Sequence, residues 1–196
     1  MKRIYNLLAL LVLFAAVGAA GLNNAQAAAP GTQAKSLTFS NITSTSAKIS
    51  WINGNGTGRL VVVFPNSTSE ATIDAAITNG TEYSGNAVYA VGSDISTGYA
   101  VYRATGSGRT VTVTSLAANT TYNVKVYEYR NDGGTDPEYN ENSASNNPRT
   151  FTTAVAAVAA PTAMSTTAPK FNGWTTNWTH SDPVVDGYEL QIGNDG

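Results

Sequence analysis

Acidic side chains gather in one predicted loop, NDGGTDPEYNEN, over residues 131–142. Asp132, Asp136, Glu138 and Glu141 supply the carboxylate oxygens that Ca²⁺ takes as ligands. Their spacing differs from that of the EF-hand loop, in which acidic or amide residues alternate from the first position and a glutamate closes the loop. The cluster is therefore interpreted as a solvated turn, and Asp132 and Asp136 are kept as candidates for a binding surface.

Tyrosines are the other side chains suited to recognition. Tyr127 and Tyr129 fall on the face of a predicted strand opposite to Val124 and Val126. Exposed tyrosines stack on sugar rings or anchor a protein partner, whereas ordinary cross-strand pairing on a sheet surface is the alternative interpretation. We therefore predict a candidate binding surface of Tyr127, Tyr129, Asp132 and Asp136, with an unknown protein or polysaccharide as its partner.

Catalytic chemistry has little support in this sequence. The chain has no cysteine, which excludes disulfides, thiolate metal ligands and a cysteine nucleophile. Its one histidine, His180, is followed directly by a serine and an aspartate, and neighbours in sequence do not form a triad, which needs an arrangement in space. Asp74, Asp94 and Glu128 stand alone in the sequence, so only folding would pair them. We predict no catalytic residue, cofactor or metal.

The first 27 residues have the three parts of a secretory signal. Lys2 and Arg3 precede the apolar run 7–22, and the small-residue sequence AQA ends at Ala27, where cleavage is expected. A retained membrane anchor is the alternative, but the run is shorter than the ~20 residues that cross a bilayer.

Cleavage after Ala27 leaves nine basic and 13 acidic side chains. Such a mildly acidic chain is a poor match for nucleic acid or anionic membrane.

Short strands with turn signals follow. Ala47, Ile49 and Trp51 alternate with polar residues, which indicates a half-buried strand. Residues 60–64 form a continuous apolar run, typical of a fully buried strand. Further strands are predicted at 99–102, 111–113, 122–126 with Lys125 pointing out, and 149–152, and a short helical turn at 73–77. Many short strands with regular turns predict an all-β sandwich or barrel.

The segment leading into the strand at 122–126 carries a family signature. Leu116, Thr120 and Tyr122 match the pattern Leu-x-Pro-x-Thr-x-Tyr, with Ala118 in place of the proline. On these residues and Trp51, residues 34–153 resemble a fibronectin type III domain. The resemblance implies an immunoglobulin-like β-sandwich, a tyrosine corner at Tyr122 and a core that contains Trp51 and Leu116. The surplus length between the strands at 60–64 and 99–102 is similar to a long-insert variety in secreted proteins of Bacteroidetes-like bacteria.

A second copy is predicted to begin after a short Ala/Val-rich linker at residues 154–159. Trp174, Thr176 and Trp178 alternate as a strand, with Trp178 in the place of Trp51. Three strands would leave an apolar face and an open edge uncovered. The domain prediction is therefore a signal peptide at 1–27, a fibronectin type III-like domain at 28–153, and a truncated second domain at 160–196.

The sequence favours a non-catalytic exported module, secreted or at the cell surface, of bacterial origin and monomeric. It would serve as a spacer, adhesion or accessory binding unit of a larger protein. The alternative is the N-terminal accessory region of an extracellular hydrolase, a glycosidase or protease, whose catalytic domain lies beyond residue 196. This alternative rests on analogy with other proteins that carry such domains.

Overall fold

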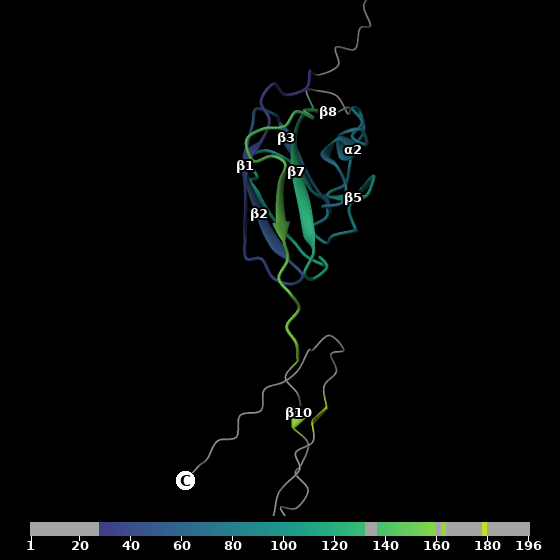
Figure 1. The fold of residues 1–196 in the computed structure, drawn as a ribbon. Helices are drawn as coiled ribbons and strands as arrows, with labels where there is room; N and C mark the ends of the chain where they lie inside the picture. Colours follow the sequence, from purple (N-terminus) through teal and green to yellow (C-terminus); the bar gives the residue numbers. More distant parts are fainter. Residues whose placement is uncertain (1–27, 132–136, 160–161, 164–177, 180–196) are drawn as a thin grey trace, which may run out of the picture.

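Two antiparallel β-sheets lie face to face in the computed structural model, which describes residues 28–131, 137–159, 162–163 and 178–179 (Figure 1). The smaller sheet has the order β1-β2-β6, and the larger has the order β4-β5-β3-β7-β8, with β9 also paired to β7. The strands of the smaller sheet are β1 (Lys35–Ser40), β2 (Ala47–Ile52) and β6 (Thr110–Val113). Those of the larger are β3 (Gly58–Pro65), β4 (Asp94–Ile95), β5 (Gly98–Thr105), β7 (Thr121–Arg130), β8 (Glu138–Tyr139) and β9 (Arg149–Thr152).

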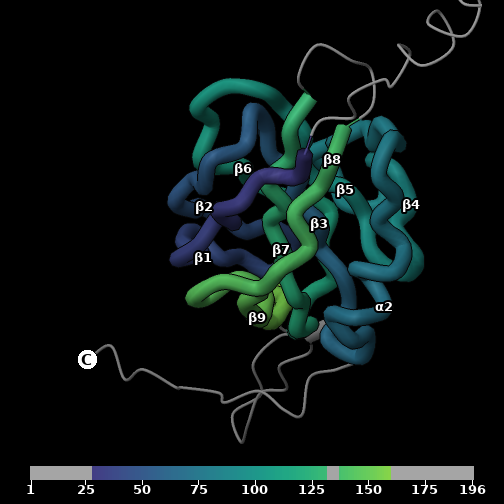
Figure 2. Tube along the Cα trace, turned by 90° about the horizontal axis from the view of Figure 1, so that it is seen from above, coloured from purple at the N-terminus to yellow at the C-terminus, as the bar shows by residue number. Residues whose placement is uncertain are grey.

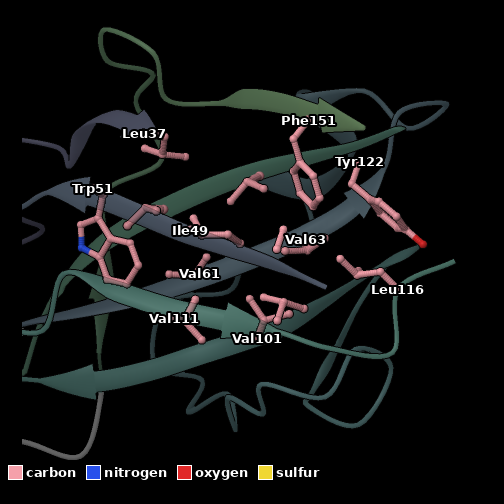
Figure 3. Packing of buried hydrophobic residues seen from close by; sticks show 14 of the residues in the cluster. Leu37, Ile49, Trp51, Val61, Val63, Val101, Val111, Leu116, Tyr122 and Phe151 are labelled. Atoms are coloured by element: carbon pink, nitrogen blue, oxygen red, sulfur yellow. The ribbon is translucent and has the colours of Figure 1, made fainter. Parts of the chain in front are cut away.

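The main core fills the space between the two sheets (Figure 3). The period of two in a strand sends alternate residues of β2 and β7 into this layer. Trp51, Leu116 and Tyr122, which the sequence assigns to the core, are 3%, 3% and 4% exposed. The other members of this cluster are Ala34, Leu37, Ala47, Ile49, Val61, Val63, Val101, Val111, Val113, Val124, Val126 and Phe151.

A second core lies on the other face of the larger sheet, where a simple sandwich would meet water. It is built from side chains of β3, β5, β7 and β8 and from the chain between β3 and β5. This double covering explains why seven consecutive residues of β3, from Gly58 to Phe64, are buried. The cluster consists of Leu60, Val62, Phe64, Ile73, Ile77, Tyr83, Ile95, Ala100, Tyr127, Tyr129 and Tyr139.

The covering layer is the long insertion between β3 and β5, here called the insertion (residues 66–97). It begins with a helical turn, α2 (Glu70–Asp74), whose N-cap Ser69 accepts a hydrogen bond from the N–H of Thr72. The helical turn expected at 73–77 therefore lies in this region but starts earlier. Both views place α2 on the side of β3 and β7 away from β1 and β2 (Figures 1 and 2).

The insertion also reaches the smaller sheet. Val88 forms an isolated parallel bridge with Thr114, just after β6. Tyr89 from the same segment packs edge-on against Tyr122, with ring centroids 5.3 Å apart. One segment therefore contacts both sheets, and it pairs with the chain beside the edge strand β6, where backbone groups would otherwise be open to solvent.

The corner before β7 has the expected geometry. The hydroxyl of Tyr122 accepts a hydrogen bond from the backbone N–H of Ala117 at 3.0 Å, which is a tyrosine corner. With β1, β2 and β6 in one sheet and β3, β5, β7 and β9 in the other, the structure is an immunoglobulin-like sandwich of fibronectin type III character.

The two ends of the chain lie mostly outside the described residues. The predicted signal peptide is among them, and so is most of the predicted second domain. From that region only a two-residue pairing is described, between β10 (Thr162–Ala163) and β11 (Trp178–Thr179). Within the described ranges, no helix is long and apolar enough to cross a membrane.

Candidate functional site

The face of β7 that carries Lys125, Tyr127 and Tyr129 points away from the main core, as the alternation predicts. It is not a surface, however. Tyr127 is 0% exposed and Tyr129 is 1% exposed, because the insertion and β8 cover them. The interpretation of these two tyrosines as an exposed binding surface is therefore wrong. Lys125, which the sequence places facing solvent, has a side chain that is 0% exposed.

The Tyr129 ring occupies a space in the second core that the absence of a side chain at Gly58 leaves open. Its strand partner across β3 is Gly58, and a Cβ added at Gly58 would lie 2.2 Å from Cζ of the Tyr129 ring. The Tyr139 ring packs against it at a centroid distance of 5.6 Å, and the Arg103 guanidinium lies 4.9 Å from its centroid. The ring thus fills space that only glycine leaves free, and cation–π contact adds to its burial.

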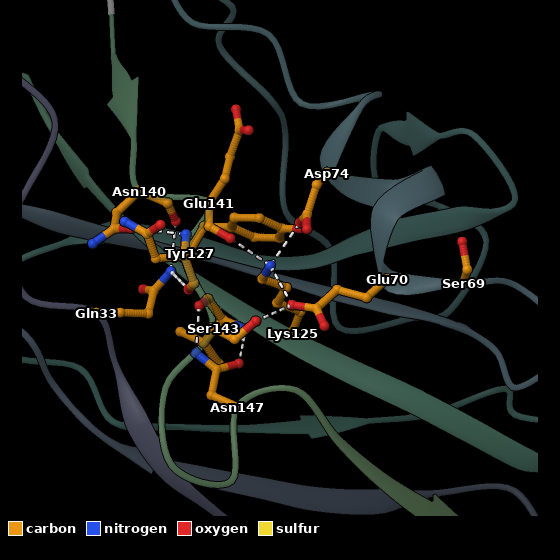
Figure 4. A network of polar contacts seen from close by, with 12 residues as sticks. Gln33, Ser69, Glu70, Asp74, Lys125, Tyr127, Asn140, Glu141, Ser143 and Asn147 are labelled. Carbon is orange, nitrogen blue, oxygen red and sulfur yellow. Dashed lines mark hydrogen bonds and ion pairs between the residues drawn. The ribbon is translucent and has the colours of Figure 1, made fainter.

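Lys125 is the buried centre of an ionic cluster whose carboxylates, those of Glu70 and Asp74, are partly exposed (Figure 4). Its ammonium donates to Glu70 Oε1 at 2.6 Å, to Asp74 Oδ1 at 2.7 Å and to the backbone oxygen of Glu141 at 2.6 Å. Glu70 and Asp74 are four residues apart on α2, a spacing that places both on one face of a helix. All three N–H donors of the lysine are therefore used, which is what a buried charge requires.

Two more side chains complete this cluster, and the pKa values reflect it. The Tyr127 hydroxyl donates to Asp74 Oδ1 at 2.7 Å, and the Ser143 hydroxyl donates to Glu70 Oε1 at 2.7 Å. Burial raises the pKa of the Tyr127 phenol well above its usual range, and the nearby Asp74 carboxylate raises it further. For Glu70, burial raises the pKa, but hydrogen bonds from Lys125 and Ser143 and the lysine charge outweigh it, and the net pKa is lowered.

A second polar group ties the entry of the chain to β7. The Asn147 side chain donates to the carbonyls of Ala34 and Val126, both at 2.8 Å, and accepts from the Val126 N–H at 3.0 Å. The Gln33 amide oxygen accepts from the backbone N–H of Glu128 at 2.8 Å. These amides replace strand pairing at a place where backbone groups would otherwise be buried without partners.

A third polar group is centred on Glu128, whose backbone N–H bonds to Gln33 of the second group. Glu128 is fully buried, and its carboxylate accepts from Arg59 Nε at 2.8 Å and from the N–H groups of Gly54 and Gly56 at 2.8 and 2.9 Å. Arg59 also donates to the carbonyls of Gly106 and Gly56. A buried charge pair with this many hydrogen bonds holds the turn after β2 against the end of the sandwich.

The remaining residues of the predicted site and acidic loop do not belong to these three polar groups. Asp132 and Asp136 lie outside the described residues, as does the side chain of Trp178. Glu138 and Tyr139 of the same predicted loop form β8 and are buried. Over the described residues, no group of three or more His, Cys, Asp or Glu side chains is placed to hold a metal ion.

Sequence reasoning missed the Lys125 cluster, although two signals pointed to it. One is a lysine between valines and tyrosines on a strand that is apolar on both faces. The other is the i, i+4 pair Glu70 and Asp74 in the only insertion predicted to hold a helical turn. Their meeting depends on how the insertion folds back over the sheet, which strand patterns do not encode.

Comparisons with known proteins give likenesses of fold only. No protein-family model matches the chain, and no curated protein matches it. Among solved structures, it is similar to a fibronectin type III domain of human collagen XX, with 19% identity, 66% of this chain and 99% of that chain covered, and a TM-score of 0.40. It is also similar to the FN5 domain of Drosophila Lar, with 13% identity, 65% and 99% coverage, and a TM-score of 0.38.

A redesigned β-sandwich protein is similar to the same extent, with 22% identity, 61% of this chain and 92% of that chain covered, and a TM-score of 0.38. At these identities and scores the likenesses say nothing about a ligand or an activity. The sandwich assignment stands on the strand order and the tyrosine corner of this chain itself.

Proposed function

We propose that residues 28–153 form a non-catalytic spacer module of a larger exported protein, secreted or held at a bacterial cell surface. The observation that carries this proposal is the position of the two ends of the sandwich. The described chain enters at one end, beside β8, and leaves at the other, after β9 (Figure 1). A domain with its ends at opposite poles holds its neighbours apart along one line.

The polar side chains support the same role. Three polar groups are centred on Lys125, Asn147 and Glu128. In each group the side chains form hydrogen bonds with other side chains of the protein or with its backbone. The tyrosines that would have offered a binding surface belong to the second core. In the described part of the module, these polar and aromatic residues therefore make internal contacts that rigidify the domain. A spacer needs such rigidity more than a binding unit does.

The test replaces residues 30–153, in the whole protein and its native host, with an unrelated β-sandwich whose ends also lie at opposite poles. A spacer tolerates this exchange, so surface level and activity of the whole protein stay near those of the natural protein, whereas deletion without replacement reduces them. Normal surface level combined with loss of a binding activity would show that the module itself recognises a ligand. Export is checked by N-terminal sequencing, which should begin at Ala28.

A further inference from the structure

Lys125 is a buried primary amine held against a carboxyl group from a distant part of the chain. Its side chain is 0% exposed, and its Nζ lies 2.7 Å from Asp74 Oδ1, across 51 residues of sequence. A lysine amine is a nucleophile once it has passed a proton to a neighbouring base. The hydrogen bond to Oδ1 holds the nitrogen beside the carboxyl group whose carbon, Cγ, it would attack.

Asp74 is arranged as an electrophile. Its Oδ1 accepts hydrogen bonds from both Lys125 Nζ and the Tyr127 hydroxyl, each at 2.7 Å. A phenol that donates to a carboxyl oxygen stabilises the negative charge that develops on that oxygen when a nucleophile attacks the carbon. The Tyr127 ring also lies beside the lysine, with Nζ 5.0 Å from its centroid, and gives the pair an aromatic wall.

Glu70 is placed to carry protons between the two groups. Its Oε1 lies 2.6 Å from Lys125 Nζ, and the Ser143 hydroxyl fixes the same oxygen at 2.7 Å. Its position one helical turn before Asp74 keeps it on the same face of α2. A carboxylate within hydrogen-bond reach of the attacking nitrogen has the geometry of a general base.

We propose that Lys125 and Asp74 condense into an intramolecular amide, an isopeptide bond, with Glu70 as proton carrier and Tyr127 as the hydrogen-bond donor to the oxygen that becomes the amide carbonyl. The nitrogen–carbon bond forms between Lys125 Nζ and Asp74 Cγ, and the bond from Cγ to Oδ2 breaks. Two of the three ammonium protons pass by way of Glu70 to Oδ2, which leaves as water. Glu70 ends in its starting state, and no oxidant or other reactant is consumed.

A free amine and a free acid react slowly in solution, whereas the fold holds Lys125 and Asp74 together at a high effective concentration. Groups held in reactive contact have effective concentrations of about 10⁵–10⁸ M, far above any concentration of free amine and acid. The product joins the insertion to β7 covalently and encloses the residues between Asp74 and Lys125. The second core would then stay closed even when the strand pairing around it is lost. This inference does not depend on the spacer role.

The first experiment is the intact mass of the full chain, purified after folding and measured under denaturing conditions. The expected mass is one water below the mass calculated from the sequence. The Lys125→Arg variant cannot form the amide, so its mass should equal the value calculated from its own sequence. Tryptic digestion should release one branched peptide that contains both Lys125 and Asp74. A full-mass chain whose Lys125 is cleaved by trypsin like any other lysine would overturn the proposal.

Three variants separate this bond from other reactions that lose water. Asp74→Asn should form the same amide with loss of ammonia instead of water, because only the leaving group changes. Glu70→Gln keeps a polar side chain at the same place and should leave the chain at full mass, or slow the mass loss at least tenfold. Tyr127→Phe should slow it without abolishing it.

Succinimide formation is the competing source of a lost water or ammonia. Water would be lost at the Asp-Gly pairs 132–133, 186–187 and 195–196, and ammonia at the Asn-Gly pairs 53–54, 55–56, 79–80 and 172–173. A succinimide persists in Lys125→Arg and opens again at alkaline pH, whereas the amide is absent from that variant and does not open. A mass loss that survives in Lys125→Arg overturns the proposal. A branched peptide that links Lys125 to Glu70 would overturn the assignment of Asp74 as its partner.

Discussion

At the scale of single residues, Trp51 fills the space between the two sheets. It is 3% exposed, and its ring meets Tyr102 edge-on at a centroid distance of 5.4 Å. Its indole Nε1 is buried without a hydrogen-bond partner. The volume and apolar area of the tryptophan therefore stabilise the fold, whereas its unpaired Nε1 destabilises it.

Replacing Trp51 with alanine should lower the free energy of unfolding by about 3–5 kcal/mol, because the missing ring leaves a cavity in a close-packed core. Trp51→Phe should cost clearly less, because it retains an aromatic ring and removes the unpaired indole donor. Urea denaturation of the full chain and both variants measures the difference. An alanine variant as stable as the natural chain would show that Trp51 does not anchor the core.

At the scale of elements, β7 belongs to two cores at once. Tyr122, Val124 and Val126 enter the main core, while Tyr127 and Tyr129 enter the second core. Such a strand tolerates change on neither face, and its partner β3 is adapted to it: Gly58 lies opposite Tyr129, where no side chain would fit. The requirement for glycine here comes from close packing against a ring.

Gly58→Ala should lower the free energy of unfolding by about 1–3 kcal/mol, because the added methyl overlaps the Tyr129 ring and forces it to move. The same substitution made together with Tyr129→Ala should cost less than it does alone, and a double-mutant cycle measures this coupling. Gly31→Ala is the matched control, since nothing lies within 4 Å of a Cβ at that position. Equal effects at Gly58 and Gly31 would contradict the packing argument.

At the scale of the whole molecule, the insertion converts a two-layer sandwich into three layers. Its aromatic residues are distributed over both cores: Tyr83 packs against Tyr139 in the second, and Tyr89 packs against Tyr99 and Tyr122 at the edge of the main one. Burial raises the pKa of Tyr89 to about 12, and of Tyr139 to about 12. The folded chain therefore keeps protons on these phenols that the unfolded chain gives up near pH 10.

Stability should accordingly be lost at alkaline pH. A pKa that is raised in the folded state means that the phenols stabilise the fold fully below about pH 10 and lose this contribution as pH rises toward about 12. Urea midpoints measured across that window should fall together with the appearance of phenolate absorbance. Tyr89→Phe should make the fall less steep. A midpoint independent of pH up to 12 would contradict the burial of these phenols.

The sequence alone was sufficient for the sandwich, because strand alternation and the tyrosine corner are local signals. Trp51, Leu116 and Tyr122 stand in patterns that a few neighbouring residues define, and each lies in the core that those patterns indicate. The alternation of β7 also correctly separated Lys125, Tyr127 and Tyr129 from the valines. A period of two states which residues share a face, since successive side chains point to opposite sides of a sheet.

Only the tertiary structure decided what covers each face. Tyr127 would be exposed on a bare sheet, and it is buried here because residues 66–97 fold back over it. The same folding brings Glu70 and Asp74 to Lys125 across more than 50 residues. Contacts between segments so far apart depend on the path of a loop whose local sequence fits many conformations. Burial and ion pairing at this site are therefore properties of the assembled layers and are absent from any single strand pattern.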